Sequence, residues 1–149
     1  MAAPRRLVVF DALMVRALAL NDTASFPDEL AAYRTAFRGQ RFRVLLTDRI
    51  ITEYLKASIY FPQIVLQPTL DAIADSGRSL YLEESELHRS PVTLERLPKR
   101  HRPLVQDAIA GNAEYFVTKW PPWLRVAEQT RNRYGLHIVT PARFVELEG

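Results

Sequence analysis

The sequence predicts an α/β fold in which a five-stranded parallel sheet lies between two layers of helices. Short apolar stretches with strand character alternate with helical patterns along the whole chain. The expected strands are apolar throughout, which is typical of parallel strands buried on both faces. The 149 residues contain no internal repeat, low-complexity segment or linker, so we expect a single domain over residues 1–149. A three-layer α/β/α sandwich fits these observations.

The first elements follow from apolar runs and from the residues that end them. An apolar strand at 6–11 leads into a helical pattern at 12–20. After a loop, a second helix at 28–38 ends at Gly39, because glycine suits the backbone at a helix C-terminus. The run 42–46 is the second expected strand.

Capping residues and prolines divide the middle of the chain. Thr47 and Asp48 offer side-chain oxygens that cap a helix N-terminus. The elements expected after them are a helix at 49–61 stopped by Pro62, a helix at 63–76 interrupted near Pro68 and ended by Gly77, and a strand at 79–82.

The last third of the chain continues the alternation of helices and strands. An irregular acidic stretch precedes a helix at 103–112 and a strand at 115–118. Pro121 and Pro122 suit a first helical turn, so a helix is expected at 121–134, with Gly135 as its cap. The chain is expected to end in a strand at 136–140 and a helix at 142–148.

Composition excludes several classes of protein. The sequence has no cysteine, which excludes disulfide scaffolds, thiol catalysis and cysteine-bound zinc. Its longest apolar runs, such as 7–10, are far too short to span a membrane, and the N-terminus lacks the apolar region of a signal peptide. We therefore expect a cytoplasmic protein without membrane contacts. The net charge of +3 is too small to indicate nucleic-acid binding by itself.

Two acids lie where a parallel sheet places its ligands, beyond the carboxyl ends of the strands. Asp11 ends the first strand, and Glu53 lies on the helix that follows the second strand. Asp11 also suits the N-cap of the next helix, and this role is compatible with metal binding or catalysis. Carboxylates from separate strand ends are a common way to hold magnesium or manganese, so both acids are candidate metal ligands.

Four segments of the chain resemble the PIN-domain family. They are Asp11 after Leu7-Val-Val-Phe10, Thr47 followed by Glu53-Tyr54, the run Ala108-Ile-Ala-Gly111-Asn-Ala-Glu-Tyr-Phe-Val-Thr118, and the tail Gly135-Leu-His-Ile-Val-Thr-Pro141-Ala-Arg-Phe144. The resemblance covers nearly the whole chain and is greatest to the bacterial branch of toxin components from toxin–antitoxin pairs. It implies a parallel α/β/α sandwich and a metal-dependent ribonuclease built from three or four acids. It also implies that Asp11 and Glu53 are catalytic residues.

Two of the four family acids have no counterpart in this sequence. The family places an acid at the start of the helix before strand four, where this chain has Lys99-Arg100-His101-Arg102. It places another two residues after the strand-four threonine Thr118, where this chain has Trp120. The family also follows its first aspartate with Thr-Asn, which is Ala12-Leu13 here.

No other acid is expected to replace the missing pair. Asp107 points about 120° away from the face of His101 on a helix, Asp48 is a cap, and Glu114 precedes its strand. We therefore expect weak or no metal binding at Asp11 and Glu53, no required cofactor, and impaired or lost cleavage. Magnesium or manganese is expected only if the protein is an active nuclease.

Cationic side chains near the missing acids suggest that a fixed charge replaces the metal. We expect Arg100, His101 or Lys119 to reach toward Asp11 or Glu53. The same region suggests RNA binding, with phosphate contacts from the cations and base stacking by the indole. The candidate residues are Lys99, Arg100, Arg102, Lys119 and Trp120, with His101 and Thr118 as further site positions. A solvated basic loop is the alternative interpretation, and Trp123 is expected in the core.

Three functions remain open from the sequence. The first is a degenerate PIN domain that binds RNA or a protein partner without cutting. The second is an active magnesium- or manganese-dependent ribonuclease that works from fewer acids. The third is an interaction module that binds an antitoxin-like protein or forms a homodimer. The missing acids favour the first and third functions, and the basic run with Trp120 favours the first.

Overall fold

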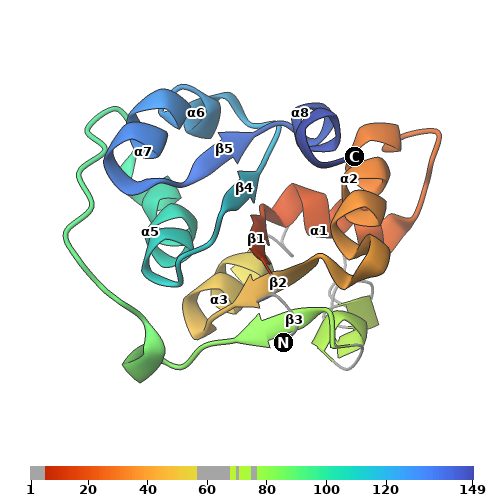
Figure 1. Ribbon diagram of the computed structural model, residues 1–149, viewed down its shortest axis with the longest axis horizontal. Helices are drawn as coiled ribbons and strands as arrows, with labels where there is room; N and C mark the ends of the chain where they lie inside the picture. Colours follow the sequence, from red (N-terminus) through yellow and green to blue (C-terminus); the bar gives the residue numbers. More distant parts are fainter. Residues whose placement is uncertain (1–5, 57–67, 70, 75–76) are drawn as a thin grey trace.

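The computed structural model describes residues 6–56, 68–69, 71–74 and 77–149 (Figure 1). These residues form a five-stranded, all-parallel sheet in the order β3-β2-β1-β4-β5, which confirms the expected fold class. The strands are β1 (Arg6–Phe10), β2 (Phe42–Leu46), β3 (Ser79–Tyr81), β4 (Tyr115–Val117) and β5 (His137–Val139).

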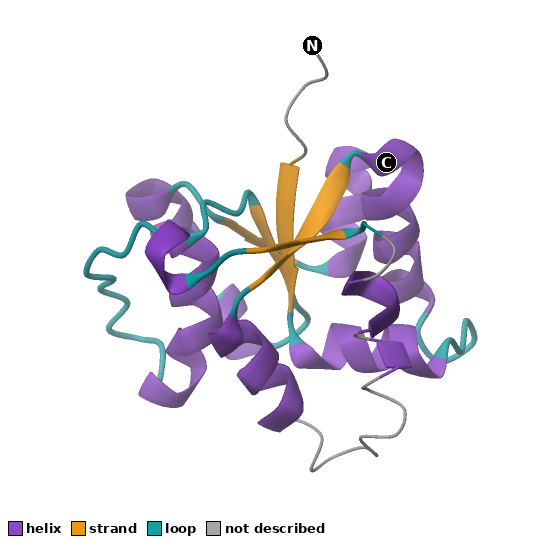
Figure 2. Cartoon of the chain, turned by 90° about the horizontal axis from the view of Figure 1, so that it is seen from below, coloured by secondary structure: helices purple, strands orange, loops and turns teal. Residues whose placement is uncertain are grey.

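Helices cover both faces of the sheet (Figure 2). On one face, Phe42 of β2 contacts Phe144, and Phe10 of β1 contacts Tyr33. On the other, Phe116 of β4 packs against Trp123. The helices are α1 (Ala12–Leu20), α2 (Pro27–Phe37), α3 (Asp48–Lys56), α5 (Arg102–Ala110), α6 (Pro121–Leu124), α7 (Ala127–Tyr134) and α8 (Pro141–Glu148), with 3₁₀ turns η1 (Arg38–Gln40), η3 (Glu84–Glu86) and η4 (Lys99–His101).

The single helix expected at 121–134 is wrong, because two helices occupy this stretch. The backbone N–H of Val126 bonds to the carbonyl of Trp123, three residues back, at 3.2 Å. This tight turn separates α6 from α7. It lets the side chains of Trp123 and Val126 enter the core, where they are 8% and 1% exposed, respectively. The expected helix parts at 57–61, 63–67, 70 and 75–76 lie outside the described residues.

Thr47 alone provides the side-chain cap of α3, although the sequence offered Asp48 as well. The Thr47 hydroxyl oxygen accepts the N–H of Ile50 at 3.0 Å. Asp48 is the first helical residue and instead accepts a hydrogen bond from the Tyr81 hydroxyl at the end of β3. Asp48 is thereby held away from the centre of the sheet.

The strand order creates a crevice at the carboxyl ends of β1 and β4. From β1 the chain adds β2 and β3 on one side, then crosses to β4 and β5 on the other. Ligands bind at such a reversal of strand order in open parallel sheets. Phe10 pairs with Val117 in the register, so Asp11 and Thr118 leave adjacent strands together. The fold therefore brings these two residues to one point.

A buried aspartate fixes the long segment between β3 and α5. Asp107 of α5 is inaccessible to solvent and accepts hydrogen bonds from the Thr47 hydroxyl at 2.6 Å and from Arg89 at 2.8 Å. Arg49 lies 3.6 Å from the same carboxylate. Asp107 is thus a structural residue outside the crevice, as its helical phase indicated.

We expect Asp107→Asn to lower the free energy of unfolding by about 1.5–3 kcal/mol, the contribution typical of hydrogen bonds to charged groups. The amide keeps the shape of the carboxylate but loses its charge beside Arg89. Urea unfolding measures the change. The control is Asp28→Asn, whose carboxylate is exposed and 4.0 Å from Lys119, and a change within about 0.5 kcal/mol is expected there. Equal effects of the two substitutions would contradict this role for Asp107.

Candidate functional site

Asp11 is the central group of the crevice and is 1% exposed. It is the N-cap of α1, and its Oδ1 accepts the N–H of Met14 at 2.8 Å. Its Oδ2 accepts a hydrogen bond from the hydroxyl of Thr118. The Thr118 oxygen in turn accepts the N–H of Trp120 at 3.0 Å. Both carboxylate oxygens of Asp11 therefore already have neutral donors.

Burial raises the pKa of Asp11 to about 6 from an ordinary value of 3.8, because desolvation disfavours the charged form. The hydrogen bonds from Thr118 and Met14 act in the opposite direction, and the nearby charge of Glu29 raises the pKa further. Asp11 thus changes protonation state much closer to neutral pH than an exposed aspartate does.

A cleft of about 510 Å³ opens beside Asp11, between α1, α3, α5 and the start of α6. We call it the aromatic cleft. Its polar and charged lining residues are Asp11, Glu53, Lys56, Arg100 and His101. The rest of the wall is apolar and consists of Ala12, Leu13, Pro103, Leu104, Trp120 and Trp123. Apolar and aromatic side chains therefore dominate a place where the resemblance expects a cluster of acids.

Three rings form one packed unit in the aromatic cleft. The rings of His101 and Trp120 meet edge to face with their centroids 3.9 Å apart, and those of Trp120 and Trp123 are 5.0 Å apart. The indole N–H of Trp123 donates to the backbone carbonyl of His101 at 2.8 Å. Trp123 is buried, as expected, and fixes the position of η4. Trp120 is half-buried and presents its indole to the cleft.

His101 is placed to remain neutral. Burial lowers its pKa and the charge of Arg100 lowers it further, while Glu53 opposes the shift. The Nε of Arg100 donates to Nε2 of His101 at 3.0 Å, which requires an unprotonated nitrogen. The side chain of His101 is consequently a hydrogen-bond acceptor and an aromatic surface rather than a fixed cation.

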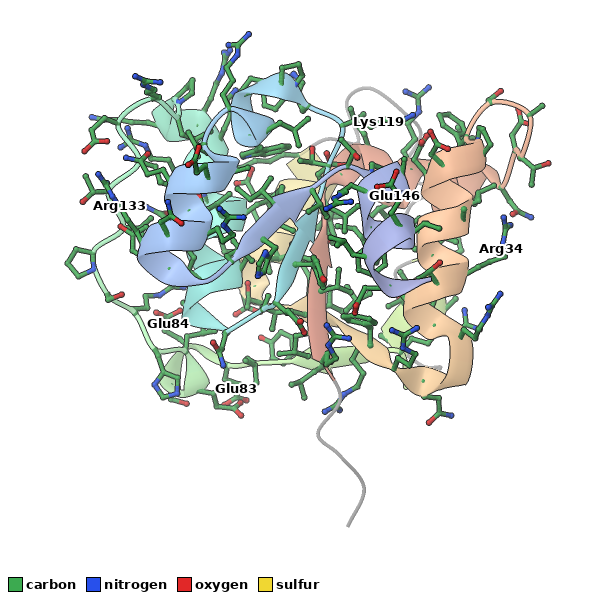
Figure 3. The ribbon with its side chains drawn as sticks, turned by 45° about the horizontal axis from the view of Figure 1, so that its top comes forward. Arg34, Glu83, Glu84, Lys119, Arg133 and Glu146 are labelled. Atoms are coloured by element: carbon green, nitrogen blue, oxygen red, sulfur yellow. The ribbon has the colours of Figure 1, made fainter. Side chains whose placement is uncertain are left out.

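The prediction that Arg100, His101 or Lys119 pairs with Asp11 or Glu53 is wrong for the described residues, where these acids have other partners. Among the described residues, Glu53 pairs with Lys56 of its own helix at 3.2 Å, and Asp11 bonds only to neutral donors. Lys119 instead lies next to α2 (Figure 3). Its Nζ is 2.8 Å from a carboxylate oxygen of Glu29 in that helix. The hydrogen bonds from Thr118 and Met14 already stabilise the Asp11 carboxylate, and Lys119 pairs with the carboxylate of Glu29 instead.

Glu29 is the site residue that the sequence analysis missed. Its side chain is only 8% exposed, and its charge acts on Asp11. In the sequence it follows Pro27 and Asp28 in the first turn of a helix, a position where acids ordinarily stabilise the helix dipole. The pattern gives no sign of burial, because burial here depends on packing between α1 and α2.

The expected nucleic-acid-binding residues divide between different surfaces. Arg100 and Trp120 line the aromatic cleft, whereas Lys119 lines a neighbouring cavity. Arg102 donates to the carbonyl of Leu97 at 2.8 Å and stabilises the preceding loop. Lys99 is exposed on η4 and lines neither cavity. Of the basic run, only Arg100 and His101 enter the cleft.

The described residues do not fit a divalent metal ion. Within residues 6–56, 68–69, 71–74 and 77–149, no three histidine, aspartate or glutamate side chains gather closely enough to hold one. Both oxygens of Asp11 are engaged by neutral donors, and Glu53 is paired with Lys56. Glu114 lies at the opposite end of β4, where it binds Arg6.

No protein-family model matches the sequence, and no curated protein matches it. None of the described helices is long and apolar enough to cross a membrane. The function is therefore inferred from the side chains of the crevice.

Asp11→Asn should reveal the raised pKa as a change in stability with pH. The folded pKa lies above the unfolded one, so the stabilisation by protonated Asp11 is complete below about pH 4 and is lost as the pH rises through about 6. Relative to the variant, wild type should lose roughly 3 kcal/mol between these limits. Urea unfolding of both proteins at acidic and neutral pH measures this. A difference that does not depend on pH would contradict it.

Proposed function

We propose that this protein is a PIN-type domain that binds single-stranded RNA in the aromatic cleft and does not cut it. The observation that carries the proposal is the content of the cleft at the end of β1 and β4. Where the sequence resemblance expects metal-binding acids, the wall holds Trp120 and His101, and cations stand at its rim. Flat aromatic surfaces with neighbouring cations are the usual means of holding unpaired nucleotides.

Trp120 supplies the surface for a base. Its edge contact with His101 and Trp123 fixes the indole, so little side-chain freedom is lost when a base stacks on it. Because every base has a π-face, this contact does not select a sequence. A half-buried indole held in this way is therefore suited to general single-strand binding.

Lys56 and Arg100 supply the charge for the phosphates. Both line the aromatic cleft, and Lys56 is well exposed despite its ion pair with Glu53. Phosphate contacts from such side chains give affinity that falls with rising salt concentration. The opposing acid charge in the cleft comes from Asp11 and Glu53, and Lys56 compensates that of Glu53.

The absence of cleavage in this proposal follows from the same residues. Phosphodiester hydrolysis by the family mechanism needs a metal held by several acids, and the described residues do not fit one. The parallel strand order agrees with the fold that the resemblance implies. A relationship to toxin–antitoxin toxins is part of the proposal and rests on the sequence resemblance.

Trp120→Ala should weaken the binding of a short labelled single-stranded RNA by roughly 5- to 150-fold, since base stacking contributes about 1–3 kcal/mol. Fluorescence anisotropy measures the dissociation constant. The matched control is Tyr81→Ala, because Tyr81 is an exposed aromatic residue outside the cleft. Arg100→Ala should reduce the slope of log affinity against log salt concentration by about one, because one phosphate contact is lost. Equal affinities of the Trp120 and Tyr81 variants would overturn the proposal.

We expect wild type to leave single-stranded RNA intact in the presence of magnesium or manganese. Gel analysis of an end-labelled RNA over hours is the measurement. Cleavage that disappears both with EDTA and with Asp11→Asn would show that the protein is an active metal-dependent nuclease. That result would replace the proposed function with the second function that the sequence left open.

A further inference from the structure

Glu53 is a charged residue of the aromatic cleft that base stacking and phosphate contact leave unused. Its side chain is 18% exposed and lines the cleft together with His101 and Trp120. Its ion-pair partner is Lys56, three residues later on the same helix, at 3.2 Å. A pair between neighbours on one helix contributes little to stability. The carboxylate of Glu53 is therefore available for a role in the cleft.

The carboxylate of Glu53 has unused capacity to accept hydrogen bonds. Lys56 donates to Oε1, and no described group donates to Oε2. Each carboxylate oxygen has two lone pairs, so Oε1 also has room for a second donor. The other acid of the cleft, Asp11, is 1% exposed and accepts hydrogen bonds from Met14 and Thr118. Glu53 is thus the more accessible carboxylate for a ligand in the cleft.

His101 offers an unused donor close to Glu53. Because Nε2 accepts a hydrogen bond from Arg100, the proton of the neutral ring lies on Nδ1. Within the part of the chain that the structure describes, no acceptor binds this proton. The charge of Glu53 acts on His101, so the two side chains are neighbours although no hydrogen bond joins them. A free donor and a free acceptor therefore border the indole of Trp120.

We propose, resting on the RNA-binding function, that Glu53 gives the aromatic cleft a preference for guanine over the other RNA bases. The Watson–Crick edge of guanine carries two parallel N–H groups, at N1 and N2, beside the acceptor O6. Two parallel donors match the two oxygens of a carboxylate, and O6 matches the Nδ1–H of His101. Uracil, cytosine and adenine do not present two parallel N–H groups to one carboxylate. Single-stranded RNA is commonly read at this edge of its unpaired bases.

Selection follows from the hydrogen bonds that the other bases leave unmade. Stacking on Trp120 holds any base, because every base has a π-face. A base other than guanine removes water from Glu53 without replacing the lost hydrogen bonds, and this reduces its affinity. Uracil also places its carbonyl oxygens beside the carboxylate, where like partial charges repel. Trp120 thus supplies affinity, and Glu53 supplies the preference.

The test is the affinity of wild type for short labelled oligouridylates that carry one guanosine, adenosine or inosine at the centre. Fluorescence anisotropy measures each dissociation constant. We expect the guanosine strand to bind about 5- to 150-fold more tightly than the adenosine strand. Inosine keeps N1–H and O6 but lacks the N2 amine, so its strand should bind with intermediate affinity. This comparison uses wild type alone and does not depend on the folding of a variant.

Glu53→Gln should bring the ratio of the guanosine and adenosine affinities close to one. The new amide group places an N–H donor against the donors of guanine. The matched control is Glu128→Gln, which changes the net charge equally at an exposed position of α7 outside the aromatic cleft. This control should keep the ratio of wild type, and circular dichroism checks that both variants fold. Equal loss of the preference in both variants would show a general effect of charge and would contradict the role of Glu53.

The possible results separate this inference from the proposed function. If wild type binds all strands equally and Trp120→Ala still weakens binding, the RNA-binding function stands and the guanine preference is wrong. If Glu53→Gln keeps the preference, another group reads the base and the assignment to Glu53 is wrong. If wild type binds none of the strands, the proposed function fails and the guanine preference fails with it.

Discussion

The hydrogen bond from Thr118 to Asp11 ties together the two strands on which the whole crevice depends. It joins the residue after β4 to the residue after β1, at the point where the strand order reverses. The same carboxylate caps α1, and the oxygen of the same hydroxyl accepts a hydrogen bond from the backbone N–H of Trp120. The direction of α1, the start of α6 and the position of the indole are therefore set by one buried pair of side chains.

This pair also determines the chemistry of the crevice. Because two neutral donors satisfy Asp11, its charge is tolerated in a buried place but costs desolvation, which is why its pKa lies near 6. The remaining acids are balanced locally, Glu53 by Lys56 and Glu29 by Lys119. Each carboxylate is thus compensated by the chain itself, and the surface left beside Asp11 is available for aromatic and apolar contacts.

The aromatic wall is a consequence of packing as much as of sequence. Trp123 fills the space between β4 and η4 and binds the backbone of His101. That contact turns His101 toward Trp120 and brings Arg100 to the rim. A stacking surface and a cationic rim arise together because η4 and the start of α6 line the same cleft.

The sequence by itself determined the layer architecture, since largely apolar strands that alternate with helices are typical of a parallel sheet covered on both faces. It also placed Asp11 and Thr118 at the carboxyl edge, because strand ends can be located from Phe10 and Val117. Only the tertiary structure decided that Lys119 pairs with Glu29 and that Arg102 turns away from the cleft. The physical reason is that strand periodicity is local, whereas burial and charge pairing depend on which helices pack together.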